Sequence, residues 1–295
     1  MTTTDHPAPT PSRRVGRHRP RAGRQLHGGP LGYALLALFT AGSLFPLLWT
    51  VVAASRDTTR LARTPPPFWF GERLPENLGT AWSEAGMGLA LGNTLLVAGT
   101  VALGTVLCCT VAGFAFARLR FRGRRGLLLL TVATMMVPPQ LGVVPLFMLI
   151  ARLRWTDQLQ AVVLPTLVSA FGVFFMRQYL LEALPGELVE AARMDGASSL
   201  RLVWHVVLPV ARPAMAVLGM LSFVQAWNDF FWPVVALTQE NPTVQVALNG
   251  LGRGYVPDQA VVMAGALLGT LPLLLAFTVL GRQIVGGIMR GALKG

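Results

Sequence analysis

A short polar segment between two long apolar stretches carries the residues whose types and spacing suggest a specific task. Residues 190–209 read EAARMDGASSLRLVWHVVLP. Glu190 and Asp195 offer carboxylates, and Ala191 and Ala192 keep the surface beside Glu190 flat enough to enter a groove on a partner. The segment holds no constellation of nucleophile, base or metal ligands, so it does not predict catalysis. The predicted chemistry is recognition of another protein.

The same segment has the signals for two short helices joined by a sharp bend. Pro185 suits a first helical turn, and Gly196 can take a positive φ as the residue that ends the first helix. Ser198 or Ser199 can cap the start of the second helix. We expect the second helix to run toward Pro209 and to stop there, because proline cannot donate a backbone hydrogen bond.

A second polar cluster interrupts a later apolar run, at WNDFFWP in residues 227–233. A carboxylate such as Asp229 inside an apolar run faces the interior of a helix bundle or a polar cavity. Two interpretations are open. Asn228 and Asp229 can line a sugar path with Trp227 or Trp232 stacked on a sugar ring, or the polar pair can join helices while the tryptophans lie near the outer interface.

Other constellations that carry chemistry are missing from the sequence. Cys108 and Cys109 are neighbours in an apolar run, and no CxxC, HExxH or clustered histidine set occurs. No GxxxxGK[ST] motif occurs either, so the chain has no phosphate-binding loop of its own. We therefore predict no cofactor, no metal and no enzyme activity, and any ATP must be handled by another subunit.

The composition is that of an integral membrane protein. The 295 residues are 53% hydrophobic and 13% charged, whereas a soluble domain has about a quarter charged residues. The net charge of +12 does not indicate nucleic-acid binding, because the basic residues lie between apolar runs rather than on one face.

The expected fold is all-α, with six membrane spans after a basic tail. Residues 1–29 are rich in Arg, Pro, Thr and Gly, and we expect them to be disordered, cytoplasmic and in contact with anionic lipid. The first apolar run is too long for a cleaved signal peptide. The predicted spans are Leu31–Ala53, Leu89–Phe116, Leu127–Ala151, Leu159–Met176, Ala214–Leu237 and Ala260–Gly281.

Basic residues set the expected orientation. With the N-terminus inside, the inner segments hold 18 of the 25 Lys and Arg and the outer segments hold 7. The positive-inside rule then predicts cytoplasmic N- and C-termini, with residues 182–212 as a cytoplasmic loop between the fourth and fifth spans. Prolines interrupt several spans, which is tolerated where other helices or a water-filled cavity satisfy the freed backbone groups.

The spacing of the polar segment resembles the coupling loop of ABC importer permeases. In that pattern EAA is followed after three residues by Gly, and after nine more by an aliphatic residue, a spacer and Leu-Pro; here these are Gly196, Val206, Leu208 and Pro209. With WNDFFWP, the PENL segment at residues 75–78 and the ending GGIMRGALKG, residues 30–295 resemble sugar-importer permeases of the maltose-transporter type. An ordinary amphipathic interfacial helix would not need the fixed spacing.

The resemblance implies a subunit of a bacterial plasma-membrane importer for a sugar or oligosaccharide. Its partners would be a second homologous permease, two ATPase subunits that dock on the coupling loop, and an extracytoplasmic solute-binding protein. The alternatives are an ABC permease for another solute, such as a phosphate ester, peptide or metal chelate, and an ion-driven secondary transporter. The latter usually shows membrane acids or paired repeats on its ion path, and here Asp229 stands nearly alone.

Overall fold

The computed structural model describes residues 29–65, 68–253 and 257–292, with side chains described as far as residue 278. Every regular element in these ranges is a helix. The chain divides into two compact units, Met1–Pro46 and Leu47–Gly295, each a unit of its own. The predicted basic tail, residues 1–29, lies outside the described residues except for Gly29.

The first helix, α1 (Pro30–Ala54), matches the predicted first span. Its side chains are apolar around the whole helix, and its buried residues are the last three, Val52, Ala53 and Ala54, which belong to the second unit. A helix that is apolar on all sides needs lipid or another chain around it, because water would not solvate that surface.

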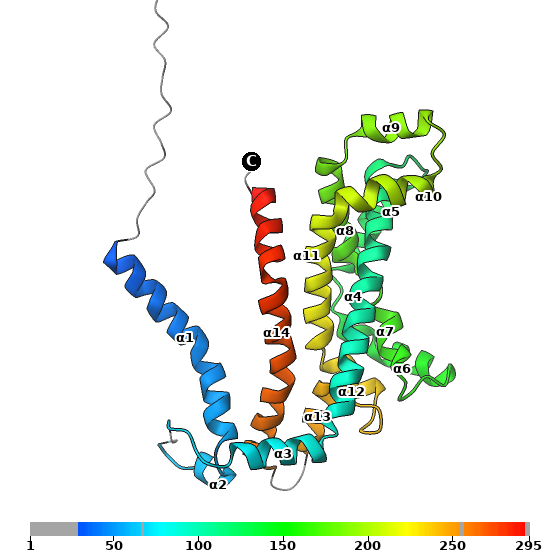
Figure 1. The fold of residues 1–295 in the computed structure, drawn as a ribbon. Coiled ribbons are helices and arrows are strands. Elements are labelled where there is room, and N and C mark those ends of the chain that lie inside the picture. The colour runs from blue at the N-terminus through cyan, green and yellow to red at the C-terminus, as the bar shows by residue number, and fades with distance from the viewer. Residues whose placement is uncertain (1–28, 66–67, 254–256, 293–295) are drawn as a thin grey trace, which may run out of the picture. The chain divides into compact units, whose positions relative to one another are not determined.

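The second unit is built around α4 (Met87–Arg118), a helix of 32 residues that matches the second predicted span. It packs along α8 (Ala170–Ala183) and α11 (Leu208–Trp227), as Figure 1 shows. Gly113 allows the closest approach, since a Cβ atom there would lie 2.8 Å from the backbone nitrogen of Arg177 and 2.8 Å from the Cβ of Met176. Small residues at such crossings let membrane helices pack tightly.

The third predicted span, Leu127–Ala151, is wrong as a continuous helix. The chain forms α5 (Arg124–Thr134), a 3-10 turn η1 (Pro139–Gly142) and α6 (Val143–Arg152), and the two halves are bent by 95°. The cause lies in Pro138 and Pro139, because each proline removes a backbone donor and the residue before a proline avoids helical backbone angles.

The fourth predicted span, Leu159–Met176, is also divided and extends further than expected. The helices α7 (Gln160–Thr166) and α8 meet at a bend of 41°, and α8 continues to Ala183. Pro165 lies in the last turn of α7, and the Ser169 hydroxyl accepts a hydrogen bond from the Gly172 N–H to start α8.

The fifth span begins and ends earlier than the predicted Ala214–Leu237. One helix runs from Ser199 to Trp227, through α10 (Ser199–Leu202), the π-helical turn η2 (Val203–Val207) and α11. The expectation that Pro209 stops the loop helix is therefore wrong. The N–H of Leu208 donates to the carbonyl five residues back, at Val203. Such a π turn ahead of the proline lets the helix continue past the missing N–H.

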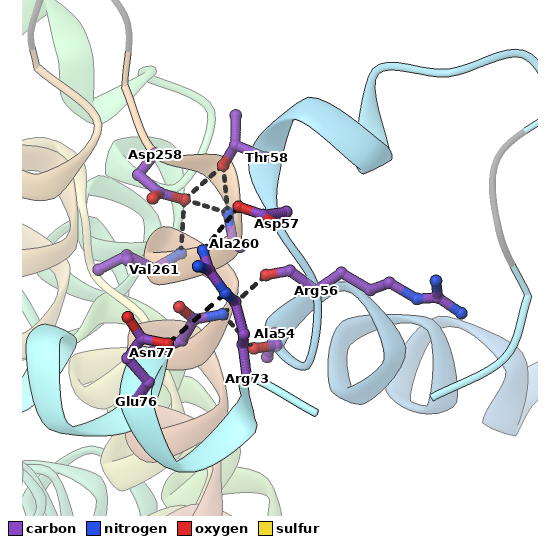
Figure 2. A network of polar contacts seen from close by, with 10 residues as sticks. All are labelled: Ala54, Arg56, Asp57, Thr58, Arg73, Glu76, Asn77, Asp258, Ala260 and Val261. Atoms are coloured by element: carbon purple, nitrogen blue, oxygen red, sulfur yellow. Dashed lines mark hydrogen bonds and ion pairs between the residues drawn. The ribbon is translucent and has the colours of Figure 1, made fainter. Parts of the chain in front are cut away.

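The end of the second unit opposite the loop helices carries shorter elements and a polar network. The short elements are α2 (Thr58–Leu61), α3 (Leu74–Glu84), α12 (Phe231–Ala236) and α13 (Val244–Leu251). Asn77 donates to the carbonyls of Ala54 and Arg56, both at 2.8 Å, and so holds α3 to the end of α1 (Figure 2). Asp258 accepts from the Ala260 and Val261 N–H groups and caps α14 (Gln259–Ala292), and the Thr58 hydroxyl donates to the same carboxylate.

The described residues thus contain four helices long and apolar enough to cross a membrane, or six if each bent pair is one span. The all-α membrane fold is confirmed at this level.

The close packing at Gly113 gives a testable expectation. Gly113→Ala should lower the stability of the detergent-solubilised protein by about 1–3 kcal/mol, because the new methyl meets backbone rather than a flexible side chain. Gly99→Ala in the same helix is the matched control, since its Cβ would meet nothing within 4 Å. Thermal unfolding followed by size-exclusion chromatography measures both; equal midpoints for the two variants would contradict this packing account.

Candidate functional site

The polar segment folds into α9 (Gly186–Met194) and a tight turn that leads into α10. Gly196 has φ +78°, as the sequence predicts. Its N–H donates to the Arg193 carbonyl at 3.0 Å, and the next N–H, of Ala197, donates to the Ala192 carbonyl at 3.0 Å. This pair of bonds is the Schellman arrangement that ends helices at a left-handed residue. Of the two candidate caps, Ser198 accepts from the Arg201 N–H at 3.3 Å.

The three residues Glu190, Ala191 and Ala192 have three different surroundings. Ala192 is half-buried against the apolar cluster formed by the ends of the spans. Ala191 is exposed and points about 100° away from Ala192 around the axis of α9. Glu190 lines a groove between α9 and the α4–α5 connection. The helix therefore separates an anchoring face from a face that is open to a partner.

The open face of α9 is apolar although the loop is polar overall. Leu188 and Met194 are 45% and 89% exposed, and with Ala191 they follow the three- to four-residue spacing of one helix face. Leu200 and Trp204 in the following helix are 68% and 59% exposed. Apolar side chains gathered at the surface of a loop are typical of a protein-binding site. We call the α9 residues of this set, Leu188, Ala191 and Met194, the docking face.

The opposite face of the loop is fixed to the membrane helices. Val189 is buried between the helices, and Leu202 and Val207 are fully buried in the same cluster, which includes Phe114 of α4 and Leu180 of α8. Leu208 packs against this cluster, Pro209 lies in the first turn of α11, and Asp195 is exposed at the C-cap of α9. Through Val189 and Ala192, α9 thus packs against the cluster that the ends of α4, α8 and α11 share.

The second predicted site lies at a cavity of about 680 Å³ beside the broken helices. Asn228 and Asp229 occupy the break between α11 and α12 and line this cavity. The backbone N–H groups of Phe231 and Trp232 face the Asp229 carboxylate. Asp229 is the one ionisable residue of the lining; neutral polar residues supply the rest of its polarity, namely Thr105, Gln140, Thr166, Ser169, Ser222, Gln225 and Asn228.

The tryptophans of WNDFFWP are both buried. Trp227 donates its indole N–H to the Gly269 carbonyl of α14 at 3.1 Å and does not line the cavity. Trp232 lines the cavity and donates to the Ala161 carbonyl of α7 at 2.9 Å. Both indoles thus join helices to one another, a role that neither interpretation of the sequence gave to the tryptophans.

Sequence reasoning missed most of the polar cavity lining. Gln140 follows Pro138 and Pro139, and Thr166 and Ser169 flank the break after Pro165. A signal was present, because polar residues beside prolines in apolar runs mark points where a span can open toward a cavity. No group of His, Cys, Asp and Glu suited to a metal occurs among the described residues.

Comparison with known proteins identifies the family to which the chain belongs. Residues 109–289 match the family described as the binding-protein-dependent transport system inner membrane component. The chain belongs to this family. The fold is similar to that of a bacterial ABC transporter involved in the import of the acidic polysaccharide alginate, with a TM-score of 0.73, 22% identity, and coverage of 85% of this chain and 94% of that chain.

Relatives with transport activity span nearly the whole chain. The lactose transport system permease protein LacG of Rhizobium radiobacter is 30% identical over 89% of this chain and 95% of that protein. The arabinooligosaccharides transport system permease protein AraQ of Halalkalibacterium halodurans is 30% identical over 90% and 95%. The sn-glycerol-3-phosphate transport system permease protein UgpE of Salmonella choleraesuis is 32% identical over 87% and 94%. The chain is a transport permease subunit, which removes the ion-driven secondary transporter from consideration.

The surroundings of Asp229 separate a structural role from a role in transport. Asp229→Asn keeps an oxygen for the Phe231 and Trp232 N–H groups, so we expect assembly and most uptake to persist. Asp229→Leu removes this oxygen and places an apolar side chain in the polar lining, so the amount of assembled subunit should fall.

Uptake per assembled complex in the native host is the measurement, and Glu240→Leu, at an exposed carboxylate, controls for loss of negative charge. Abolished uptake in a normally assembled Asp229→Asn complex would show that the carboxylate acts on the solute or an ion.

Proposed function

We propose that this chain forms, with a second homologous permease, the translocation path of an ATP-driven importer for a sugar or oligosaccharide. Two ATPase subunits would dock on residues 182–212, and an extracytoplasmic binding protein would deliver the solute. The observation that carries the proposal is α9, with its exposed apolar docking face and with Val189 and Ala192 packed into the cluster at the ends of the membrane helices.

In this proposal the docking face is where the conformational change of the ATPase acts on the permease. A partner drives a conformational change only by binding one state of the permease more tightly than the other. An ATPase that changes shape on binding ATP can do this through Leu188, Ala191 and Met194, and the buried side of α9 passes the movement to the spans. Glu190, Asp195 and Gly196 then set the charge and the bend of the element, while Leu208 and Pro209 join it to α11.

The residues that line the cavity suit a neutral solute better than an anionic one. Its lining offers amide and hydroxyl groups, which suit the hydroxyls of a sugar, and apolar side chains such as Val97 and Trp232. No lysine or arginine lines it, and the Asp229 carboxylate would repel a phosphate ester. Lactose and arabino-oligosaccharides, which two relatives carry by name, are therefore better models for the solute than glycerol phosphate.

We also propose that both termini and α9 face the cytoplasm of a bacterial cell. The partition of basic residues supports this orientation, and it places the docking face where an ATPase is. Reporter fusions at Glu72 and Glu240 should read as external, and fusions at Arg122 and Glu187 as cytoplasmic. An external signal at Glu187 would contradict both the orientation and the ATPase docking.

The bend at Gly196 tests the docking proposal. A residue with a Cβ costs roughly 1–2 kcal/mol in the left-handed region, and a β-branched residue costs more, although a Cβ at Gly196 meets nothing within 4 Å. Gly196→Val should therefore open the turn, leave membrane insertion intact, and lower both ATPase co-purification and uptake by roughly 5- to 30-fold.

Gly196→Asn is the matched control, because asparagine tolerates the left-handed conformation and should keep most ATPase binding. Wild-type ATPase binding and uptake by the Gly196→Val complex would show that this turn does not shape the coupling element.

A further inference from the structure

A basic groove lies beside α9, on the side away from the docking face. It is a cavity of about 540 Å³ between the end of α4, the start of α5 and α9. Its lining includes Arg118, Arg120, Arg124 and Arg193, with Glu190 as its single carboxylate, which leaves a net charge of +3. Figure 1 shows α9 at the end of the second unit where α5 begins.

The arginines of the groove have no carboxylate partner. The ion pairs found among the described residues both involve Arg73, at the other end of the unit. Arg118 donates from Nη2 to the Leu181 carbonyl at 2.8 Å, and Arg124 donates to the Leu119 carbonyl at 3.1 Å. These bonds fix the two guanidinium groups at the wall. The Nε–H of Arg118 is buried there without an acceptor, so the wall of the groove holds an unpaired donor and the full positive charge of this guanidinium.

The groove lies where apolar helix surface ends. Arg118 is the last residue of α4 and Arg124 is the first of α5, and Leu119 and Phe121 line the groove beside them. Outward-facing leucines on α4 and α5 continue the apolar surface away from the groove, among them Leu107, Leu127 and Leu130. A ligand here can place a negative head on the arginines and an acyl chain along these leucines.

We propose that this groove binds the phosphate headgroup of an anionic phospholipid of the inner leaflet. Basic pockets at the cytoplasmic ends of membrane helices attract such headgroups. The proposal rests on the proposed orientation, which places the groove on the cytoplasmic side. Because Arg193 belongs to α9 and Arg120 to the α4–α5 connection, the headgroup bridges the coupling helix to the membrane helices.

The position of the groove, rather than its charge, argues for a lipid over an acidic surface of the ATPase. The groove is lined by Gly186, Val189, Glu190 and Arg193 of α9, whereas the docking face is formed by Leu188, Ala191 and Met194. The two sets share no residue, so an ATPase seated on the docking face need not cover the groove.

The test measures lipid binding by the purified importer complex. Native mass spectrometry after titration with phosphatidylglycerol should show bound lipid, and phosphatidylcholine should bind at least about 10-fold more weakly. The variant Arg120→Gln with Arg193→Gln should lower phosphatidylglycerol affinity by about 10- to 30-fold, because each basic residue near a headgroup contributes a several-fold factor. Arg60→Gln with Arg63→Gln removes the same charge at the opposite end and should change little.

Equal binding of both lipids, an unchanged groove variant, or an equal loss in the two variants would overturn the proposal. Inorganic phosphate at about 10 mM should compete weakly; complete displacement by phosphate would show that the site takes the free anion. Unchanged melting midpoints of the variants confirm that they fold. Normal ATPase docking in a complex that binds no lipid would overturn this inference alone, whereas an external Glu187 reporter would overturn the orientation and this inference together.

Discussion

The packing of the loop helices onto the ends of α4, α8 and α11 is the interaction on which the rest of the structure depends. Leu202 and Val207 are fully buried there, and they meet Phe114, Leu180 and Leu184, which are also buried. Closely packed apolar clusters do not deform continuously, so an element held in one moves with its neighbours. In the proposed function this cluster connects the loop helix to the membrane helices, while the opposite face of α9 remains exposed.

The breaks in the membrane helices lie around the cavity, at a distance from the loop helices. The breaks after Thr134, Thr166 and Trp227 all border the same cavity, through Gln140, Ser169 and Asn228. Broken helices free backbone groups, which are tolerated within a membrane only where protein or water satisfies them. The structure thus combines a closely packed cluster at the loop end with interrupted helices around a polar cavity.

Part of the fold could be predicted from the sequence, because apolar runs and turn residues act locally. Long apolar runs gave α1 and α4 nearly to the residue, and turn chemistry gave the positive φ of Gly196 and the cap at Ser198. Proline positions indicated breaks but not their size, because a 95° bend depends on the partners that receive the two halves. The path of the helix through Pro209 was missed, since a π turn is set by the packing around it.

Contacts between residues far apart in the chain could not be predicted from the sequence. The indole bonds of Trp227 and Trp232 join residues 42 and 71 positions apart, so the sequence left the two interpretations of these residues open. The motif also placed Glu190, Ala191 and Ala192 on one docking surface, whereas the helix directs them to a groove, an open face and a buried cluster.

That separation leads to the most direct test of the account, which is thiol labelling of single cysteines in α9. Cys108 and Cys109 are first replaced by serine, and cysteine is introduced at Ala191, Met194 or Ala192. With the permease alone, Ala191→Cys and Met194→Cys should label rapidly and Ala192→Cys slowly, following their exposure. With the ATPase bound, the first two should become protected and the third should change little. Equal labelling of Ala191→Cys with and without the ATPase would contradict the assignment of the docking face.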